Sequence, residues 1–480
     1  MEATGIIGRN KERHLLEQIS NRRDAQLVAI YGRRRVGKTY LVKRFFNEKF
    51  DFYFTGSYHT PTAVQLSMFA QALHEYSGQP FQNFSNWMQA FSALKDYLKS
   101  LQKENIVVFL DEIPWLDVAK SNFLPSFSQF WNGWASTCEG MKIIVCGSST
   151  TWMLDKFVGD KGGFYGRSNR SIYLAPFTLN ETEQFLKSRH VQWTRFQITK
   201  LYMIMGGIPY YLDMVDPAAP FDSNIDALFF GFNAPLKNEY DFLFRTLFKN
   251  SQLYRRIVEL LSSKNKGLTQ IEIKELLKLS DGGELSKALV NLQKCDFIRA
   301  YHQYGDKKRG VMYQLTDLFS LFHLRFVDRL NGQDEHYWTN LDDHTKDAWT
   351  GYAFEMVCLH HITQIKERLG IRGVLTNACC WQAKPQVDKD GTSWKGAQVD
   401  LLLNREDNII NLCEMKFSKL EYVITEAYHQ HLEERKATFL HHTRAKKSVV
   451  VTFITTHGLK KNMHSDAYLP HQVTLDHLFQ

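Results

Sequence analysis

Apolar and polar positions alternate along the first third of the chain in the way expected for strands joined by helices. Short runs rich in β-branched and aromatic residues predict strands at 27–31, 50–54, 106–110, 142–146 and 170–174. Apolar residues at helical spacing predict a helix that ends near Ile19 and a largely helical segment over 62–101. Strands that alternate with helices indicate an α/β domain with a parallel sheet.

The pattern changes after this region. Residues 179–215 have a helical pattern interrupted at Gly206-Gly207, and the Pro-rich segment 216–220 marks a boundary. Farther on, the sequence predicts three helices and then two strands, at 253–261, 269–277, 284–293, 297–301 and 311–315. Thr269 is the expected N-cap of the second helix. Three helices followed by a hairpin are typical of a winged helix-turn-helix.

Such a module has two interpretations. If it binds DNA, the third helix enters the major groove and the basic wing touches phosphates. The contacts would then come from Ser286, Lys287, Asn291, Lys294 and the wing residues Lys307 to Arg309. Packing between domains explains the same pattern equally well.

The last third of the chain predicts a second α/β region. A long amphipathic helix is expected from Gly351 to about Leu369, followed by an alternating strand at 399–403. The polar turn at 404–408 leads into a second strand at 409–416. We therefore expect a β-hairpin preceded by a helix.

Length and composition limit the classes of protein. A chain of 480 residues is too long for one core, so we expect about two to four domains. The patterns above divide the chain at 1–177, 178–248, 249–318 and 319–480. Hydrophobic residues make up 44% and charged residues 23%, which is typical of a folded soluble protein.

Charge, cysteines and the N-terminus add three expectations. The formal charge of +8 is compatible with nucleic-acid binding, although a solvated basic surface explains it equally well. The seven cysteines form no C-x-x-C pair, which suits a reducing compartment. The sequence shows neither a secretory signal nor an apolar run long enough to span a bilayer. We therefore expect a cytoplasmic protein with no membrane partner.

The strongest chemical motif follows the first predicted strand. It is a phosphate-binding P-loop, Gly32-Arg33-Arg34-Arg35-Val36-Gly37-Lys38-Thr39, and a helical pattern comes after it. Backbone N–H groups of such a turn point at phosphate oxygens. Lys38 is expected to contact the β- and γ-phosphates, and the Thr39 hydroxyl to ligate Mg²⁺.

A second motif supports a nucleotide site. The apolar strand at 106–110 ends in Asp111-Glu112. Because ligands of parallel α/β sheets bind at the carboxyl ends of strands, we expect this pair to lie near the P-loop. Asp111 can then hold Mg²⁺, and Glu112 can orient or deprotonate the attacking water.

The hairpin of the last third carries a further candidate site. Glu414 and Lys416 are two residues apart, so they project from one face of their strand, and Asp400 on the neighbouring strand can lie beside them. Glu355 on the preceding helix can add another acid. Carboxylates of this kind bind Mg²⁺ or Mn²⁺, which activates water, and the lysine can offset charge in the transition state.

The N-terminal half resembles AAA+-type ATPases, in particular the prokaryotic group related to the STAND NTPases. The likeness rests on Gly8-Arg9, the tribasic P-loop, Asp111-Glu112 and Gly206-Gly207-Ile208-Pro209. It implies ATP as the ligand and a conformational switch. It also adds Arg9 to the nucleotide site and places Ser148 where the family senses the γ-phosphate. An arginine finger is not identifiable, with Arg167 and Arg170 as candidates, so the resemblance leaves open whether the protein acts as an oligomer.

The C-terminal third is similar to the domain often fused to these ATPases, which resembles PD-(D/E)xK nucleases of the restriction-endonuclease-like fold. The resemblance makes Glu355 the helix acid, Asp400 the first-strand acid, Glu414 the second acid and Lys416 the lysine.

Together these features predict an ATP-binding, ATP-hydrolysing switch coupled to a metal-dependent nuclease-like domain. The expected partners are ATP and nucleic acid, DNA rather than RNA, and the architecture suits defence against foreign DNA. Two alternatives stay open: an ATP-controlled DNA-binding protein without nuclease activity, and a partner-sensing ATPase whose winged helix contacts protein.

Overall fold

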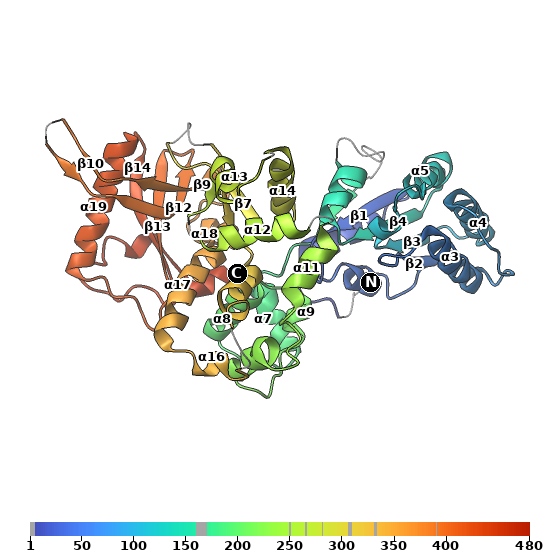
Figure 1. The fold of residues 1–480 in the computed structure, drawn as a ribbon, viewed down its shortest axis with the longest axis horizontal. Helices are drawn as coiled ribbons and strands as arrows, with labels where there is room; N and C mark the ends of the chain where they lie inside the picture. The colour runs from blue at the N-terminus through green and yellow to red at the C-terminus, as the bar shows by residue number, and fades with distance from the viewer. Residues whose placement is uncertain are drawn as a thin grey trace. The chain divides into compact units, whose positions relative to one another are not determined.

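The computed structural model describes residues 5–159, 170–248, 251–264, 266–280, 282–305, 310–330, 334–389 and 391–480. The chain divides into two compact units (Figure 1). The first comprises Met1–Pro176 with Leu243–Lys249, and the second comprises Phe177–Phe242 with Asn250–Gln480. Among the described residues, no helix is long and apolar enough to cross a lipid bilayer.

A five-stranded parallel sheet forms the centre of the first unit, as the sequence predicts. Its strands lie in the order β2-β3-β4-β1-β5. They span β1 Gln26–Tyr31, β2 Phe52–Thr55, β3 Ile106–Asp111, β4 Met141–Gly147 and β5 Arg170–Tyr173. The helices are α1 Asn10–Ser20, α2 Lys38–Phe45, α3 Thr62–Ser77, α4 Trp87–Ser100, α5 Phe123–Gly133 and α6 Thr150–Trp152, which continues as a π-helical turn over Met153–Val158.

An aromatic core packs α3, α4 and α5 of this unit together. Trp87 has no solvent exposure and makes edge-on ring contacts with Phe69 and Phe123, while Phe91 contacts Phe127. Burial of one such side chain contributes about 1.5–3 kcal/mol. This aromatic layer belongs to the same buried core as the strand residues Leu27, Ala29 and Val108.

The second unit begins with a helical segment. Its helices are α7 Leu179–Ser188, α8 Arg195–Met205, α9 Pro209–Leu212 and α10 Phe221–Ile225, followed by a π-helical turn over Asp226–Phe230. The predicted break is present, because Gly206 and Gly207 end α8 with φ of 66° and 68°. A Cβ on Gly207 would lie 2.3 Å from the carbonyl oxygen of Phe177, so the close approach requires glycine.

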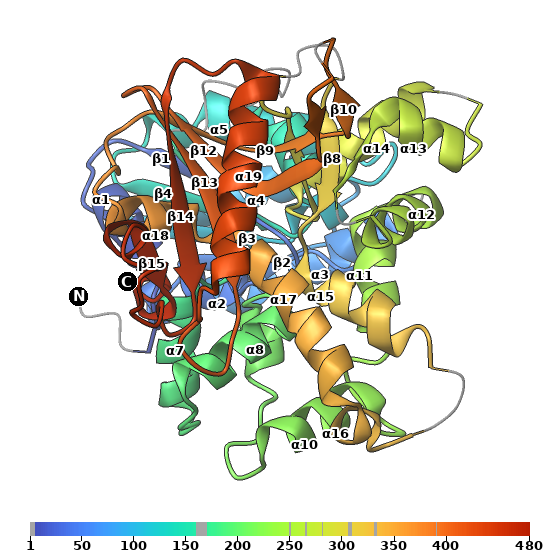
Figure 2. The same ribbon diagram turned by 90° about the vertical axis from the view of Figure 1, so that its left-hand side faces the viewer.

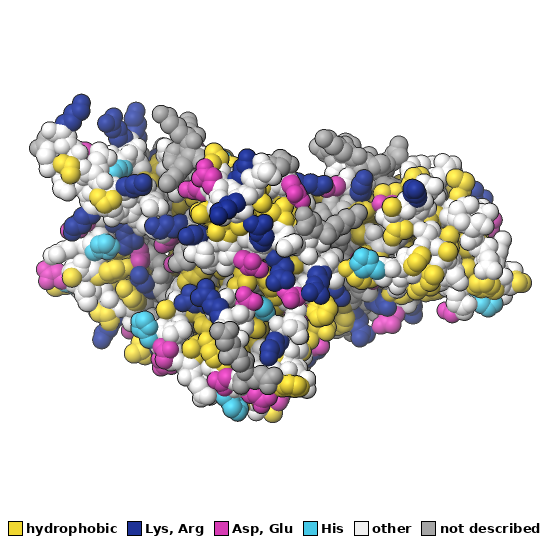
Figure 3. Space-filling view, viewed as in Figure 1, with side chains coloured by type: hydrophobic (Ala, Val, Ile, Leu, Met, Phe, Trp, Pro, Cys, Tyr) yellow, Lys and Arg dark blue, Asp and Glu magenta, His cyan; other side chains and the backbone are white. Residues whose placement is uncertain are grey.

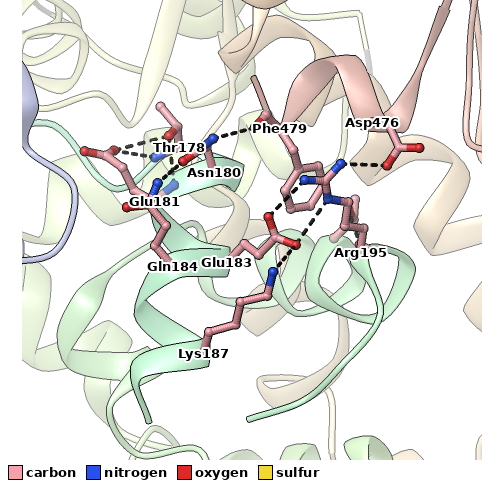
Figure 4. Close-up of polar contacts among 10 residues, drawn as sticks. Thr178, Asn180, Glu181, Glu183, Gln184, Lys187, Arg195, Asp476 and Phe479 are labelled. Atoms are coloured by element: carbon pink, nitrogen blue, oxygen red, sulfur yellow. Dashed lines mark hydrogen bonds and ion pairs between the residues drawn. The ribbon is translucent and has the colours of Figure 1, made fainter. Parts of the chain in front are cut away.

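Polar contacts connect this helical segment to the C-terminal end of the chain (Figure 4). Arg195 binds Glu183 of α7 at 3.1 Å and Asp476 of α20, Leu475–Leu478, at 2.9 Å. Asn180 donates a hydrogen bond to the carbonyl oxygen of Phe479. The helical segment and the chain end therefore belong to one packed body.

The middle of the second unit contains the three predicted helices and two predicted strands. The helices are α12 Ser251–Ser262, α13 Gln270–Leu276 and α14 Gly282–Lys294. They follow α11, Glu239–Leu247, whose residues from Leu243 onward belong to the first unit. A small sheet has the order β6-β8-β7, with β6 Leu268–Thr269, β7 Ile298–Tyr301 and β8 Met312–Leu315. Thr269 caps α13 through a reciprocal capping box with Glu272, as predicted.

One predicted DNA contact on α14 is wrong. Asn291 is buried, and its Nδ2 donates a 2.8 Å hydrogen bond to the Tyr254 hydroxyl. The Asn291 amide therefore bonds inside the helical module instead of facing a ligand. Lys287 is exposed. The predicted wing contacts Lys307 to Arg309 lie outside the described residues.

A mixed five-stranded sheet dominates the last third, in the order β15-β14-β13-β12-β9. Strands β9 Thr376–Ala383, β12 Ala397–Arg405 and β13 Ile409–Lys416 are antiparallel, while β14 Ser448–Thr455 and β15 Gln472–Thr474 continue in parallel. Helix α17, Asp343–His360, packs against β13, and α19, Glu426–Thr443, packs against β12 and β14 (Figure 2). Strands β10 Gln386–Val387 and β11 Ser393–Trp394 form a short antiparallel pair. Two further helices precede α17. They are α15 Leu318–Phe322, extended by a π-helical turn over His323–Val327, and α16 Tyr337–Asn340.

The predicted single helix over 351–369 is corrected by the structure. Helix α17 begins at Asp343 and ends at His360, and α18 occupies Ile362–Arg368. His361 lies at the break, where its Nδ1 bonds to the carbonyl oxygen of Val357 and its Nε2 accepts from the amide of Leu179. The histidine therefore satisfies a free amide at the start of α7, a long-range contact that no local pattern contains.

Candidate nucleotide site and acidic site

The P-loop connects β1 to the start of α2, the context that the motif requires. Gly32 has φ of 152° and packs against Leu174, whose carbonyl oxygen would lie 2.3 Å from an added Cβ. Gly37 has φ of 91°, and no atom lies within 4 Å of the place where its Cβ would be. The Lys38 ammonium donates to the carbonyl oxygens of Gly32 and Arg33 at 2.9 and 3.0 Å. Its burial lowers the pKa of Lys38.

The other P-loop residues differ in their burial. Arg33 and Val36 are buried, whereas Arg34 and Arg35 are half-buried. Arg9 is also buried, and its guanidinium donates to the carbonyl oxygens of Val36 at 3.1 Å and Ala175 at 2.7 Å. The arginine thus joins the P-loop to the chain segment after β5.

Thr39 and Asp111 meet at the carboxyl end of the sheet. Strand β4 lies between β1 and β3, yet the Thr39 hydroxyl donates a 2.7 Å hydrogen bond to Asp111 Oδ2. Asp111 is buried, and burial together with the neighbouring Glu112 raises its pKa to about 6. A bound divalent cation would favour the ionised form, so the pair suits a hydroxyl-and-carboxylate cation site.

Glu112 and Ser148 form a second contact at the same edge. Glu112 follows β3 with φ of 48°, a left-handed conformation that is uncommon for residues other than glycine. Its Oε2 accepts hydrogen bonds from the Ser148 amide at 2.9 Å and from the Ser148 hydroxyl at 2.8 Å. The two residues that the sequence predicts as water-orienting acid and phosphate sensor are therefore linked directly.

The sequence offers two arginine-finger candidates, Arg167 and Arg170. Arg170 is exposed at the first position of β5. Arg167 lies outside the described residues.

In the second unit, Glu414 is held by three side chains. Its Oε2 accepts from Arg435 at 2.7 Å, and its Oε1 accepts from the Tyr428 hydroxyl at 2.5 Å and from Lys416 at 2.8 Å. Burial by itself raises the pKa of Glu414, but the neighbouring cations and the hydrogen bonds lower it by more. The net shift of its pKa is therefore downward. Glu414 is therefore a half-buried, ionised carboxylate with both oxygens engaged.

The other two predicted acids lie near Glu414. Asp400 accepts from Gln398, and with Glu355 it lines a cavity of about 20 Å³, which is room for roughly one water molecule. Burial and the charges of Asp400 and Glu414 raise the pKa of Glu355 to about 8. Arg299 of β7 lines the same cavity and donates to Gln314 at 2.7 Å. Glu355 and Asp400 thus line one cavity, while Glu414 pairs with Lys416.

The arrangement does not form a cation site as it stands. Within the part of the chain that the structure describes, no group of three His, Cys, Asp or Glu residues is placed to hold a metal ion. Both carboxylate oxygens of Glu414 already have hydrogen-bond or ion-pair partners. Sequence analysis missed Tyr428, Arg435 and Arg299, which belong to no motif and come from elements outside the hairpin.

Comparison with known proteins supports the nucleotide site. Residues 7–215 match the family model described as an ATPase domain predominantly from Archaea. An uncharacterised protein of Methanocaldococcus jannaschii is 24% identical over 87% of this chain and 88% of its own length. An uncharacterised ATP-binding protein of the same organism is 46% identical over 44 residues, which are 9% of this chain and 75% of that protein.

Two solved structures are distantly similar to this chain. The Walker-type ATPase of Pyrococcus abyssi is 18% identical with a TM-score of 0.46, covering 67% of this chain and 96% of its own. The ORC2 protein of Aeropyrum pernix is 13% identical with a TM-score of 0.44, covering 68% of this chain and 94% of its own. Likenesses this distant do not bear on function. The family match and the site geometry agree: residues 7–215 are similar to an ATPase domain found predominantly in Archaea, and they contain a P-loop.

Proposed function

We propose that the protein is an ATP-driven switch that binds and hydrolyses ATP with Mg²⁺ at the P-loop. The contact between Thr39 and Asp111 carries the proposal, because it joins the two motifs at one point. Thr39 and Asp111 would hold Mg²⁺, which neutralises charge on the phosphates when bound. Lys38 would exchange its two carbonyl partners for phosphate oxygens. Glu112, steadied by Ser148, would orient the attacking water.

A binding experiment tests the cation site. Mg²⁺ should strengthen ATP binding to the wild type, and Asp111→Asn should remove most of that strengthening because a neutral amide is a poor ligand for Mg²⁺. Asp96→Asn, an exposed position on α4, is the matched control. Equal dependence on Mg²⁺ in wild type and Asp111→Asn, measured by calorimetry, would refute the assignment.

For the rest of the chain we propose a lid and connector over 178–248, a winged helix over 249–318 and a nuclease-like domain over 319–480. Support for the nuclease-like domain comes from Glu355 on α17 and from Asp400, Glu414 and Lys416 on paired strands. Because the carboxylates as arranged do not hold a cation, this part of the proposal rests on residue placement. Cleavage of plasmid or tRNA with Mg²⁺ or Mn²⁺, with and without ATP, tests it, and wild type as inactive as Lys416→Ala in every condition would remove it.

A second candidate is an ATP-controlled DNA-binding protein without nuclease activity. The occupied carboxylate of Glu414 favours it, and the exposed Lys287 on α14 offers a phosphate contact. Salt-dependent DNA binding that weakens in Lys287→Gln, without metal-dependent cutting, would support this candidate. If no nucleic acid binds at low salt, a partner-sensing ATPase becomes the better description. Defence against foreign DNA is compatible with the first candidate.

A further inference from the structure

The β10–β11 pair and α19 border an open groove of about 310 Å³ on the second unit. Its volume falls within the range of ligand sites, about 300–1,000 Å³. Its larger polar and aromatic lining residues are Trp394, Lys395, His431, Glu434 and Arg435. Among the described residues that line it, Glu434 is the one acid. Arg435 already binds Glu414 at 2.7 Å, so we assign it no ligand in the groove.

Trp394 is held in one orientation at the wall of this groove. Its indole ring stacks on the His441 ring of α19, with centroids 4.0 Å apart and planes 10° apart. Its Nε1 donates a 2.9 Å hydrogen bond to Asp388 Oδ2, the same oxygen that His441 Nε2 contacts at 2.9 Å. One carboxylate therefore positions both rings. Because the ring is ordered before a ligand arrives, binding to it costs less conformational entropy.

Positive charge lies beside the aromatic wall. Lys and Arg side chains gather over the β10–β11 pair (Figure 3), where Lys384, Lys389 and Lys395 are exposed. Lys395 pairs with Glu434 at 3.0 Å, but the two side chains keep 83% and 56% of their exposure. An exposed ion pair of this kind contributes little stability, so an incoming anion can take the ammonium from the carboxylate. The groove therefore combines a fixed ring with exchangeable cations.

We propose that this groove binds single-stranded nucleic acid, with a base stacked on Trp394 and backbone phosphates on Lys389 and Lys395. Aromatic rings stack on every kind of base, and cations beside them bind the backbone. A base in a duplex must first leave its own stack, so the ring favours a single strand. The surface lies on the β10–β11 pair and α19 rather than on α14 or at the acidic site, and it requires neither ATP nor a divalent cation. It is therefore separate from the sites of the proposed function.

Fluorescence anisotropy with a labelled oligo(dT) or oligo(U) strand tests the surface. The full chain is titrated in EDTA without ATP, which prevents metal-dependent cutting of the strand and leaves the nucleotide site empty. Wild type should bind at low salt and lose affinity as salt rises. Lys395→Gln should make the log–log salt slope shallower by about 0.7, the value for one lost phosphate contact on a single strand, and Lys389→Gln should act similarly. Lys187→Gln is the matched control, because Lys187 is also exposed and pairs with Glu183 at 3.0 Å, and it should leave binding unchanged.

Three further variants separate binding from a structural role. Trp394→Ala should weaken binding about tenfold, a size typical for the loss of one stacked base. Trp394→Phe loses the hydrogen bond to Asp388 but keeps a ring, so it should retain most of the affinity. Glu434→Gln removes the acid that competes for Lys395 and should tighten binding about threefold. A structural role of these residues does not predict such a gain.

A shallower salt slope in Lys395→Gln, weaker binding in Trp394→Ala and tighter binding in Glu434→Gln together support the groove. If the strand binds equally well to wild type, Lys395→Gln and Trp394→Ala, the groove is refuted. Loss of binding in Lys287→Gln alone would then place the strand on α14 and leave the DNA-binding candidate standing. Tighter binding of a duplex than of a single strand, with no effect of Trp394→Ala, would overturn the single-strand assignment. If neither probe binds at low salt, both the groove and the DNA-binding candidate are refuted.

Discussion

Replacing Glu112 by glutamine tests the catalytic half of the nucleotide site. The substitution keeps the size of the side chain and one acceptor oxygen, so the contact with the Ser148 amide at 2.9 Å can persist. It removes the negative charge and the capacity to take a proton. We therefore expect Glu112→Gln to fold normally and to bind ATP within about threefold of the wild-type affinity, since the lost group faces the attacking water rather than the phosphates.

The expected loss of hydrolysis follows from the role of the group. A positioned general base contributes about 10²–10⁴ in rate, which is about 3–5.5 kcal/mol of barrier. The two hydrogen bonds from Ser148 support this range, because they hold the carboxylate in one place rather than leaving it free in solvent. Phosphate release under single-turnover conditions is the appropriate assay, with Glu139→Gln, an exposed acid of the same unit, as control.

If Glu112→Gln hydrolyses ATP at a rate close to wild type while binding it normally, the attacking water is oriented by another group. The link between Glu112 and Ser148 would then serve the conformation of the loop after β3, where Glu112 adopts φ of 48°.

Three further changes have defined outcomes. Lys38→Ala should lose ATP binding in an equilibrium assay, because the P-loop cation is removed. Gly32→Ala should lower the thermal midpoint and cost about 1–3 kcal/mol of stability, since its Cβ would lie 2.3 Å from the Leu174 carbonyl oxygen. Burial of His361 lowers its pKa from 6.5 to about 4, so the unfolded chain binds the proton more tightly and stability is lost as the pH falls from about 6.5 to 4. That pKa difference corresponds to about 3 kcal/mol of unfolding free energy. Urea unfolding at pH 7 and 4.5 should show that His361→Gln loses less stability at the lower pH than wild type. Glutamine keeps a polar partner for the Leu179 amide.

The nucleotide site follows from the sequence because its parts are local or lie at strand ends. Residues 32–39 are contiguous, and their phosphate-binding geometry is a property of a glycine-rich turn between a strand and a helix. Asp111 is distant in sequence, but a parallel sheet brings strand ends to one edge, so its place near Thr39 could be predicted. The insertion of β4 between β1 and β3 could not, because strand order depends on how whole elements pack.

The acidic site shows what the tertiary structure alone decided. The hairpin and its alternation place Asp400, Glu414 and Lys416 together from sequence alone, since side chains two apart share a face. The state of that site depends on Arg435, whose position is set by the packing of α19 against the sheet. A buried charge takes whichever partner the fold brings within reach, and long-range burial leaves no periodic trace in the chain. The sequence therefore determined which groups are available for chemistry, while the folded structure determined which of them are already bound to one another.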